Sequence, residues 1–118
     1  MPKKQTERSA QPVLKKQVFY TPQAREFIDS LADDVQAEVT ACFQTLEMQG
    51  HLEFPAGRKL DRGLFEVRVA MEGNAYRVFY CYGTATAVWA LSGFVKKTQQ
   101  TPLREIARAL KIKRSIGL

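Results

Sequence analysis

The chain has 118 residues, of which 45% are hydrophobic and 25% are charged, a balance that excludes a globally disordered protein. No stretch approaches the roughly 20 apolar residues of a membrane-spanning helix. The N-terminus also lacks the apolar core of a signal peptide, so we expect a cytoplasmic protein with no membrane partner. Cys42 and Cys81 lack the spacing of metal ligands and are predicted to be reduced core residues.

The net charge of +6 is distributed unevenly. Residues 1–16 carry five Lys or Arg and one Glu, and residues 96–114 carry seven and one, whereas residues 17–95 carry six basic against ten acidic side chains. Positive charge concentrated in this way suits a polyanion. A basic terminus can equally serve solubility alone. We favour that interpretation for residues 1–12, expected to be a flexible basic arm ahead of a single domain at residues 13–118.

The first part of this domain is predicted to be a scaffold of one strand and two helices. Val13 to Tyr20 can form an edge strand. Thr21-Pro22 is typical of a helix start, with threonine as N-cap and proline in the first helical position. A second helix is expected after an Ala-Asp-Asp turn and should end near Gly50, a natural C-terminal cap. Together the two helices form an acidic hairpin whose apolar stripes can cover one face of a sheet.

Three strands are predicted in the second part. Leu64 to Ala70 and Tyr76 to Tyr82 alternate apolar and polar side chains with the period of two of a half-buried strand. Glu72-Gly73-Asn74 between them suits a tight hairpin. A turn at Gly83-Thr84 then leads to a third strand, Ala87 to Val95, and Arg62-Gly63 can turn the chain back to a short strand at Gly57 to Leu60.

The register of these strands predicts a basic face. If the first hairpin loop has two or four residues, Arg68 lies opposite Arg77 or Phe79, and both arginines project from the same side. With an even-length second loop, Ser92, Phe94 and Lys96 continue that side. The predicted basic face therefore carries Lys59, Glu66, Arg68, Arg77 and Lys96. The opposite, apolar face is expected to be the core side: Leu60, Phe65, Val67, Val69, Tyr76, Val78, Tyr80, Trp89, Leu91 and Val95.

A C-terminal helix is predicted to follow, because Thr101-Pro102 repeats the cap and first-turn pattern. Arg104, Arg108 and Lys111 line up at helical spacing on its solvated side, where they can contact phosphate or line a partner-binding groove. Lys97 leaves the end of the preceding strand in the opposite direction to Lys96 and can reach outward.

The clustered cations point to an anionic ligand, since a guanidinium matches phosphate oxygens bidentately. The sequence has no Gly-rich phosphate loop, no carboxylate cluster and no Cys/His set, so no cofactor and no metal are expected. RNA cleavage needs neither when the substrate's 2′-hydroxyl is the nucleophile, and fixed cations can stabilise the transition state. A lysine of lowered pKa or Glu66 could take the proton, although Glu66 can equally be a salt-bridge partner of Lys59 or Arg68. His51, the only histidine, is another possible acid or base, but a histidine just beyond a helix end is more often a solvated or capping residue.

Three motifs carry a family resemblance: KLDRGLFEVRV at Lys59 to Val69, YRVFY at Tyr76 to Tyr80, and LSGFVKKTQQTPLREIARAL at Leu91 to Leu110. Through them the chain resembles the RelE/ParE toxin superfamily, and within it the phage-derived HigB-like toxins, from about Phe19 to Lys111. The resemblance implies an α+β fold with two N-terminal helices packed on an antiparallel sheet of about four strands, plus a C-terminal helix.

The same resemblance implies a toxin of a type II toxin-antitoxin pair. Such a toxin is an endoribonuclease that cuts mRNA in the ribosomal A site, inhibits translation, and is neutralised by a helix-turn-helix antitoxin in a complex that can be of higher order. It points to Arg68, Arg77 and Lys96 as catalytic, with Lys59 and Lys97 as further RNA-binding residues. The C-terminal His or Tyr acid of several members is missing, since neither type follows Tyr82. A ParE-like gyrase inhibitor and a non-catalytic nucleic-acid-binding module stay open as alternatives.

Overall fold

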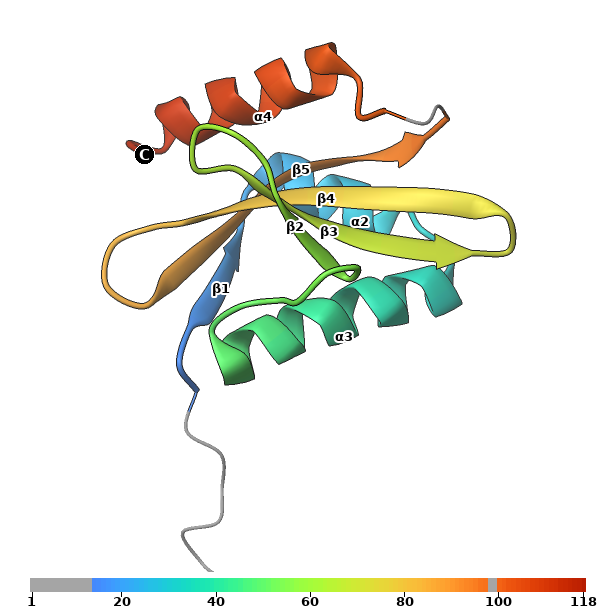
Figure 1. Ribbon diagram of the computed structural model, residues 1–118, viewed down its shortest axis with the longest axis horizontal. Helices are drawn as coiled ribbons and strands as arrows, with labels where there is room; N and C mark the ends of the chain where they lie inside the picture. Colours follow the sequence, from blue (N-terminus) through green and yellow to red (C-terminus); the bar gives the residue numbers. More distant parts are fainter. Residues whose placement is uncertain (1–13, 98–99) are drawn as a thin grey trace, which may run out of the picture.

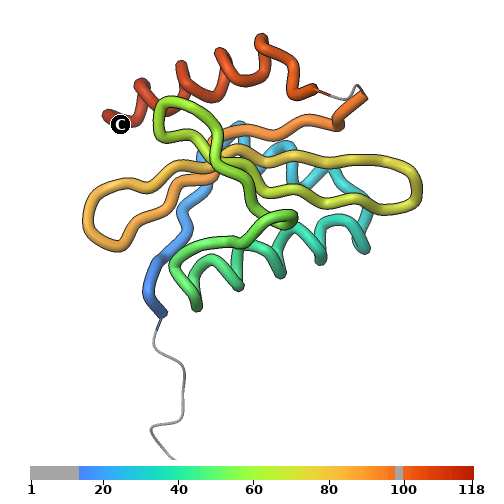
Figure 2. Tube along the Cα trace, in the orientation of Figure 1, coloured from blue at the N-terminus to red at the C-terminus, as the bar shows by residue number. Residues whose placement is uncertain are grey.

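The computed structural model describes residues 14–97 and 100–118, so the predicted arm at residues 1–12 lies outside the described part (Figure 1). A five-stranded sheet in the order β1-β5-β4-β3-β2 separates α2 and α3 on one face from α4 on the other (Figures 1 and 2). The predicted α+β class is confirmed. None of the helices in the described residues is long and apolar enough to cross a membrane. The elements in chain order are β1 (Gln17–Tyr20), α2 (Pro22–Asp29), α3 (Asp33–Gln49), β2 (Gly57–Lys59), β3 (Phe65–Met71), β4 (Asn74–Tyr82), β5 (Ala87–Lys96) and α4 (Leu103–Ser115).

The sheet has one strand more than the predicted four, and it is not purely antiparallel. β1 pairs in parallel with β5, from Gln17 beside Ala87 to Tyr20 beside Ala90, whereas the other neighbouring strands are antiparallel. Parallel pairing needs a long crossover connection. Here α2, α3 and the strands β2 to β4 lie between the two paired strands in the sequence.

The predicted helix caps of the N-terminal hairpin are confirmed. The Thr21 hydroxyl oxygen accepts a hydrogen bond from the Ala24 N–H at 3.1 Å and donates to the Leu91 carbonyl oxygen at 2.6 Å. At the end of α3, Gly50 adopts a left-handed φ of 88° and its N–H donates to the Leu46 carbonyl. These residues fix where each helix begins and ends, and thereby how the hairpin lies on the sheet.

The turn between β3 and β4 decides between the two predicted registers. Met71 pairs with Asn74, which leaves a two-residue loop of Glu72 and Gly73 with φ values of 51° and 80°. Two positive φ values are those of a type I′ hairpin turn, which matches the twist of the strands it joins. Arg68 consequently pairs with Arg77.

Both faces of the sheet are buried, which corrects the prediction of a single core side. One core lies under α2 and α3, and a second lies under α4. Trp89 and Leu91 were expected in the first core but pack in the second, as does Leu60. Trp89 and Leu91 of β5 change sides because the pairing with β4 is irregular between Phe79 and Tyr80. Leu91 is an extra residue of β5 at this point and has no partner in β4.

The predicted basic face is therefore divided along its length. Under α4 it is apolar, with the rings of Phe79 and Phe94 stacked at 5.5 Å between centroids. Ser92, Phe94 and Lys96 do continue the face of Arg77, as expected. Only the end of this face away from the apolar packing carries charge.

Candidate functional site

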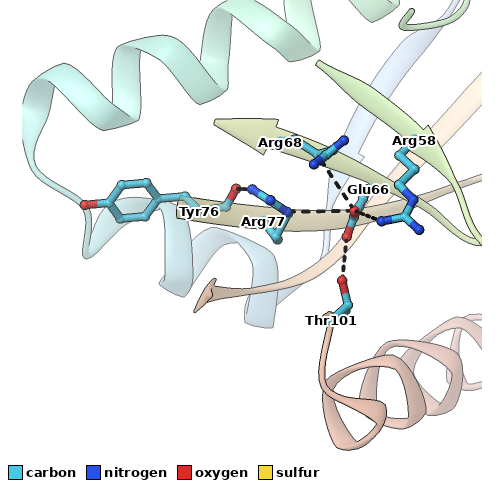
Figure 3. Close-up of polar contacts among 6 residues, drawn as sticks. All are labelled: Arg58, Glu66, Arg68, Tyr76, Arg77 and Thr101. Atoms are coloured by element: carbon cyan, nitrogen blue, oxygen red, sulfur yellow. Dashed lines mark hydrogen bonds and ion pairs between the residues drawn. The ribbon is translucent and has the colours of Figure 1, made fainter. Parts of the chain in front are cut away.

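A buried carboxylate lies at the centre of the charged part of this face. Glu66 of β3 has no exposed surface, and its Oε2 lies 3.9 Å from Arg58 Nη1, 3.8 Å from Arg68 Nε and 3.8 Å from Arg77 Nε (Figure 3). The three arginines come from the adjacent strands β2, β3 and β4, because Arg58 pairs with Glu66 and Arg68 pairs with Arg77. We refer to Arg58, Arg68 and Arg77 around Glu66 as the arginine cluster.

These ion pairs are too long to be hydrogen bonds. The buried atoms Glu66 Oε2, Arg68 Nε, Arg68 Nη1 and Arg77 Nε make no hydrogen bond to any described residue. Arg77 does donate from Nη1 to the Tyr76 carbonyl oxygen at 3.0 Å, which orients its guanidinium. Buried donors are normally paired, so those left over mark a place suited to an anion.

Lys96 adds a further positive charge to the cluster from the end of β5, where it pairs with Ala75 on the same face. Partial burial, together with the neighbouring Arg77, lowers the pKa of Lys96 below its usual range, and Glu66 offsets only part of this effect. Burial also lowers the pKa of Arg77, again against the opposing influence of Glu66. Within residues 14–97 and 100–118, a single carboxylate therefore faces several cations, as expected of a site that binds negative charge.

The segment leading into α4 is tied to this carboxylate. Thr101 Oγ1 donates to Glu66 Oε1 at 3.4 Å (Figure 3). The prediction that Thr101 caps the C-terminal helix was therefore wrong: the N-cap is Pro102, and no side chain within the described part of the chain caps α4. The hydroxyl is directed toward the buried carboxylate instead of the helix N-terminus.

One expected member of the basic face is replaced by its neighbour. Lys59 pairs with Phe65 and so projects from the other side of the sheet, whereas Arg58 pairs with Glu66. The predicted place of Lys59 on the basic face was wrong because five residues separate it from Phe65, and alternation alone gives no loop length. An arginine adjacent to Lys59 was the only signal in the sequence that could have found Arg58.

The remaining predicted site residues are not members of the arginine cluster. His51 follows α3, which packs on the opposite face of the sheet, and its Nε2 lies 2.7 Å from Glu53 Oε2 at the surface. Lys97 is exposed after β5. Arg104, Arg108 and Lys111 lie on the exposed side of α4, and Arg104 Nε is 3.9 Å from Glu105 Oε2.

Two hollows border the arginine cluster. A cavity of about 340 Å³ is lined by Pro55, Ala56, Arg68, Val69, Ala70 and Arg77. A larger one of about 720 Å³ lies between the loop after β2 and α4, with Arg58 at one wall and Leu103, whose side chain is largely exposed, at the other. The smaller hollow brings two guanidinium groups to one surface and is the better match to a phosphate.

Comparison with known families identifies the chain. The model of the family described as "Phage derived protein Gp49-like (DUF891)" matches residues 26–114. The chain belongs to this family. No curated protein sequence matches this Gp49-like chain.

Solved structures that resemble the Gp49-like chain in fold include the following two. One is the RelBE2 toxin-antitoxin complex from Mycobacterium tuberculosis, with 25% identity and a TM-score of 0.54 over 71% of this chain and 100% of that one. The other is a mutant of the E. coli toxin RelE in the free state, with 15% identity and a TM-score of 0.63 over 84% of this chain and 97% of that one. The resemblance to the RelE/ParE superfamily and the RelE-like fold expected from it are confirmed.

Proposed function

We propose that this Gp49-like chain is the toxin of a toxin-antitoxin pair and acts as a metal-independent endoribonuclease on mRNA, on the ribosome. The observation that carries the proposal is the arginine cluster: three guanidinium groups from three strands, with Lys96 beside them. The similar RelBE2 protein was solved as a toxin-antitoxin complex, which supports a cognate antitoxin for this chain as well. We expect that antitoxin to be a helix-turn-helix protein.

The scissile phosphate is assigned to the hollow that Arg68 and Arg77 border. There the two guanidinium groups can bind its oxygens and stabilise the extra negative charge that develops when the 2′-hydroxyl attacks phosphorus. Arg58, about half exposed, can contact the neighbouring phosphate from β2. As the 2′-oxygen bonds to phosphorus, the bond from phosphorus to the 5′-oxygen breaks, which gives a 2′,3′-cyclic phosphate and a free 5′-hydroxyl; water takes the 2′-hydroxyl proton and supplies one to the departing 5′-oxygen. Lys96 adds a positive charge near that 5′-oxygen.

Glu66 is assigned a positioning role and not that of a general base. A general base must come within hydrogen-bond distance of the proton it removes, whereas Glu66 has no exposed surface. Its carboxylate instead holds Arg58, Arg68 and Arg77 at similar distances. The arginines are thereby kept close together despite their mutual repulsion.

The decisive experiment compares Arg68→Ala and Lys96→Ala with wild type by mapping RNA 5′ ends after brief expression and in purified programmed ribosomes. We expect new ends within coding sequences for wild type and a loss of cleavage rate of about 10²-fold or more for each variant, the cost typical of removing one donor to transition-state charge. Arg25→Ala is the matched control: it removes an arginine of α2, on the other face of the sheet, and should cleave like wild type.

Two results would contradict the proposal. Folded Arg68→Ala and Lys96→Ala that cleave like wild type exclude these residues from catalysis. Growth arrest with a DNA damage response and unchanged RNA ends would select gyrase inhibition instead.

The role of Lys96 is tested separately by Lys96→Arg. If Lys96 acts as a fixed cation, Lys96→Arg keeps most activity, and wild-type activity falls as the pH rises through the lowered Lys96 pKa. If it acts as a base, Lys96→Arg is as inactive as Lys96→Ala, and wild-type activity rises over the same pH range. We expect the first outcome.

A further inference from the structure

The loop between α3 and β2 presents an aromatic ring beside the arginine cluster. Phe54 is 70% exposed and is the most exposed aromatic side chain among the described residues. The guanidinium carbon of Arg68 lies over this ring, 5.0 Å from its centroid. Its exposed ring is therefore accessible to a ligand that also contacts the arginine cluster.

The loop is fixed in place by the strand that carries Arg68. The backbone N–H of Arg68 donates to the backbone carbonyl oxygen of Ala56 at 2.8 Å, and Ala56 lies two residues after Phe54. Pro55 and Ala56 then form one wall of the hollow whose other wall is Arg68 and Arg77. The ring, the hollow and two guanidinium groups therefore lie together on one surface.

We propose that Phe54 is a stacking platform for one unpaired RNA base next to the scissile phosphate, an inference that rests on the proposed ribonuclease function. Single-stranded RNA is recognised by cations along its backbone and by aromatic rings on which its bases stack. A base is joined to its own phosphate through a single sugar. A ring that contacts a phosphate-binding guanidinium consequently lies within one nucleotide of that phosphate. The contact with Arg68 occupies part of the Phe54 ring and leaves the exposed remainder for a base.

The test combines a substitution in the protein with deletions in the RNA. Oligonucleotides that carry a 2′-deoxyribose at the cleaved nucleotide bind without being cut, and a series with one abasic residue at each flanking position removes one base at a time. Affinities for wild type and Phe54→Leu are measured on these oligonucleotides, free and in the A site of programmed ribosomes. Leucine keeps an apolar side chain but has no ring to stack.

For wild type we expect one position at which base removal weakens binding by about tenfold, within the range typical of base-aromatic stacking. In Phe54→Leu that position should lose its effect, while the other positions behave as in wild type. Phe54→Trp should restore it. Phe19→Leu, which removes a ring stacked on Trp89 at the β1 edge, is the matched control and should leave the profile unchanged.

Several outcomes overturn the inference. Identical abasic profiles for wild type and Phe54→Leu exclude stacking. Equal weakening at every position means that Phe54 only orients Arg68. Loss of antitoxin affinity without any change in the profile makes Phe54 a protein contact.

The inference and the proposed function fail separately. Suppose that Phe54→Leu abolishes the effect of base removal at one position only, and that wild type does not cleave all-ribose RNA. That result refutes the ribonuclease and supports the stacking role. Cleavage by wild type without a position-specific effect refutes the stacking role alone. If no RNA binds, free or on the ribosome, both are refuted.

Discussion

Replacing the central carboxylate of the arginine cluster with its neutral amide is the sharpest test of how the site is held together. Glu66→Gln conserves size and removes the negative charge that faces Arg58, Arg68 and Arg77. The three guanidinium groups then repel one another around a side chain that is itself closed to solvent. We expect a folded but less stable protein.

The magnitude follows from the distances and the burial. A charge pair at about 4 Å is worth roughly 4 kcal/mol at an effective dielectric constant of about 20. The contribution of Arg58 is reduced by solvent screening, because its side chain is 49% exposed. Breaking a buried pair by removing one partner typically costs about 3–5 kcal/mol. At the unfolding entropy usual for a chain of this length, that loss lowers Tm by roughly 12–20 °C.

The assay is thermal and denaturant unfolding of Glu66→Gln with and without sulfate. An anion that binds only the folded state stabilises it by mass action, so sulfate should restore part of the loss and should raise the stability of Glu66→Gln more than that of wild type. Glu53→Gln is the matched control. Glu53 pairs with His51 at the much shorter distance of 2.7 Å, but both side chains are exposed, and the cost should stay within about 1 kcal/mol.

Glu66 does not hold the cluster together if Glu66→Gln unfolds within about 1 kcal/mol of wild type and sulfate does not distinguish the two proteins. That result would mean that the arginines are screened independently of Glu66. Its proposed positioning role would then have no energetic basis.

Three further predictions concern register, packing and pH. Arg58→Ala should reduce RNA affinity and the salt dependence of that affinity. Lys59→Ala should change both much less, because of these two residues Arg58 alone projects from the face of the cluster. Fluorescence titration at several salt concentrations compares the two variants. Gly93→Ala should destabilise by about 1–3 kcal/mol in denaturant unfolding, since a Cβ there would lie 2.3 Å from the Phe27 ring, and an unchanged midpoint would contradict this packing. Burial, and to a smaller extent the neighbouring Tyr82, raises the pKa of Tyr80. The protonated Tyr80 side chain therefore stabilises the fold below its unfolded-state pKa of about 10, and this stabilisation is lost at higher pH. Unfolding free energies at about pH 8 and 11 should show that loss, and Tyr80→Phe should reduce it.

The strands and helix ends were predictable because each depends on local chemistry. Positive φ is easy for Gly73 and tolerable for its neighbour, so a two-residue turn was among the predicted alternatives, and it places Arg68 opposite Arg77. Thr21 and Gly50 have the side-chain chemistry that helix ends require. Lys96 followed from alternation along β5, which is regular from Ser92 onward.

The parts that escaped prediction depend on contacts distant in the sequence. Arg58 joins the cluster because of the length of the loop before β3, which alternation does not encode. Thr101 fits the pattern of a cap, yet a buried carboxylate 35 residues earlier competes for its hydroxyl. Trp89 packs under α4 because one extra residue interrupts the pairing of β4 with β5, and no residue type announces such an insertion.

That extra residue has an effect beyond the sheet. The carbonyl oxygen of Leu91 accepts a hydrogen bond from the Thr21 hydroxyl. The same hydroxyl oxygen accepts a hydrogen bond from the Ala24 N–H in the first turn of α2. The irregular backbone of β5 thus fixes the position at which α2 begins. A deletion of Leu91 would therefore do more than make the pairing of β5 regular. It would also remove the hydrogen bond that holds the N-terminus of α2, the helix that covers Gly93.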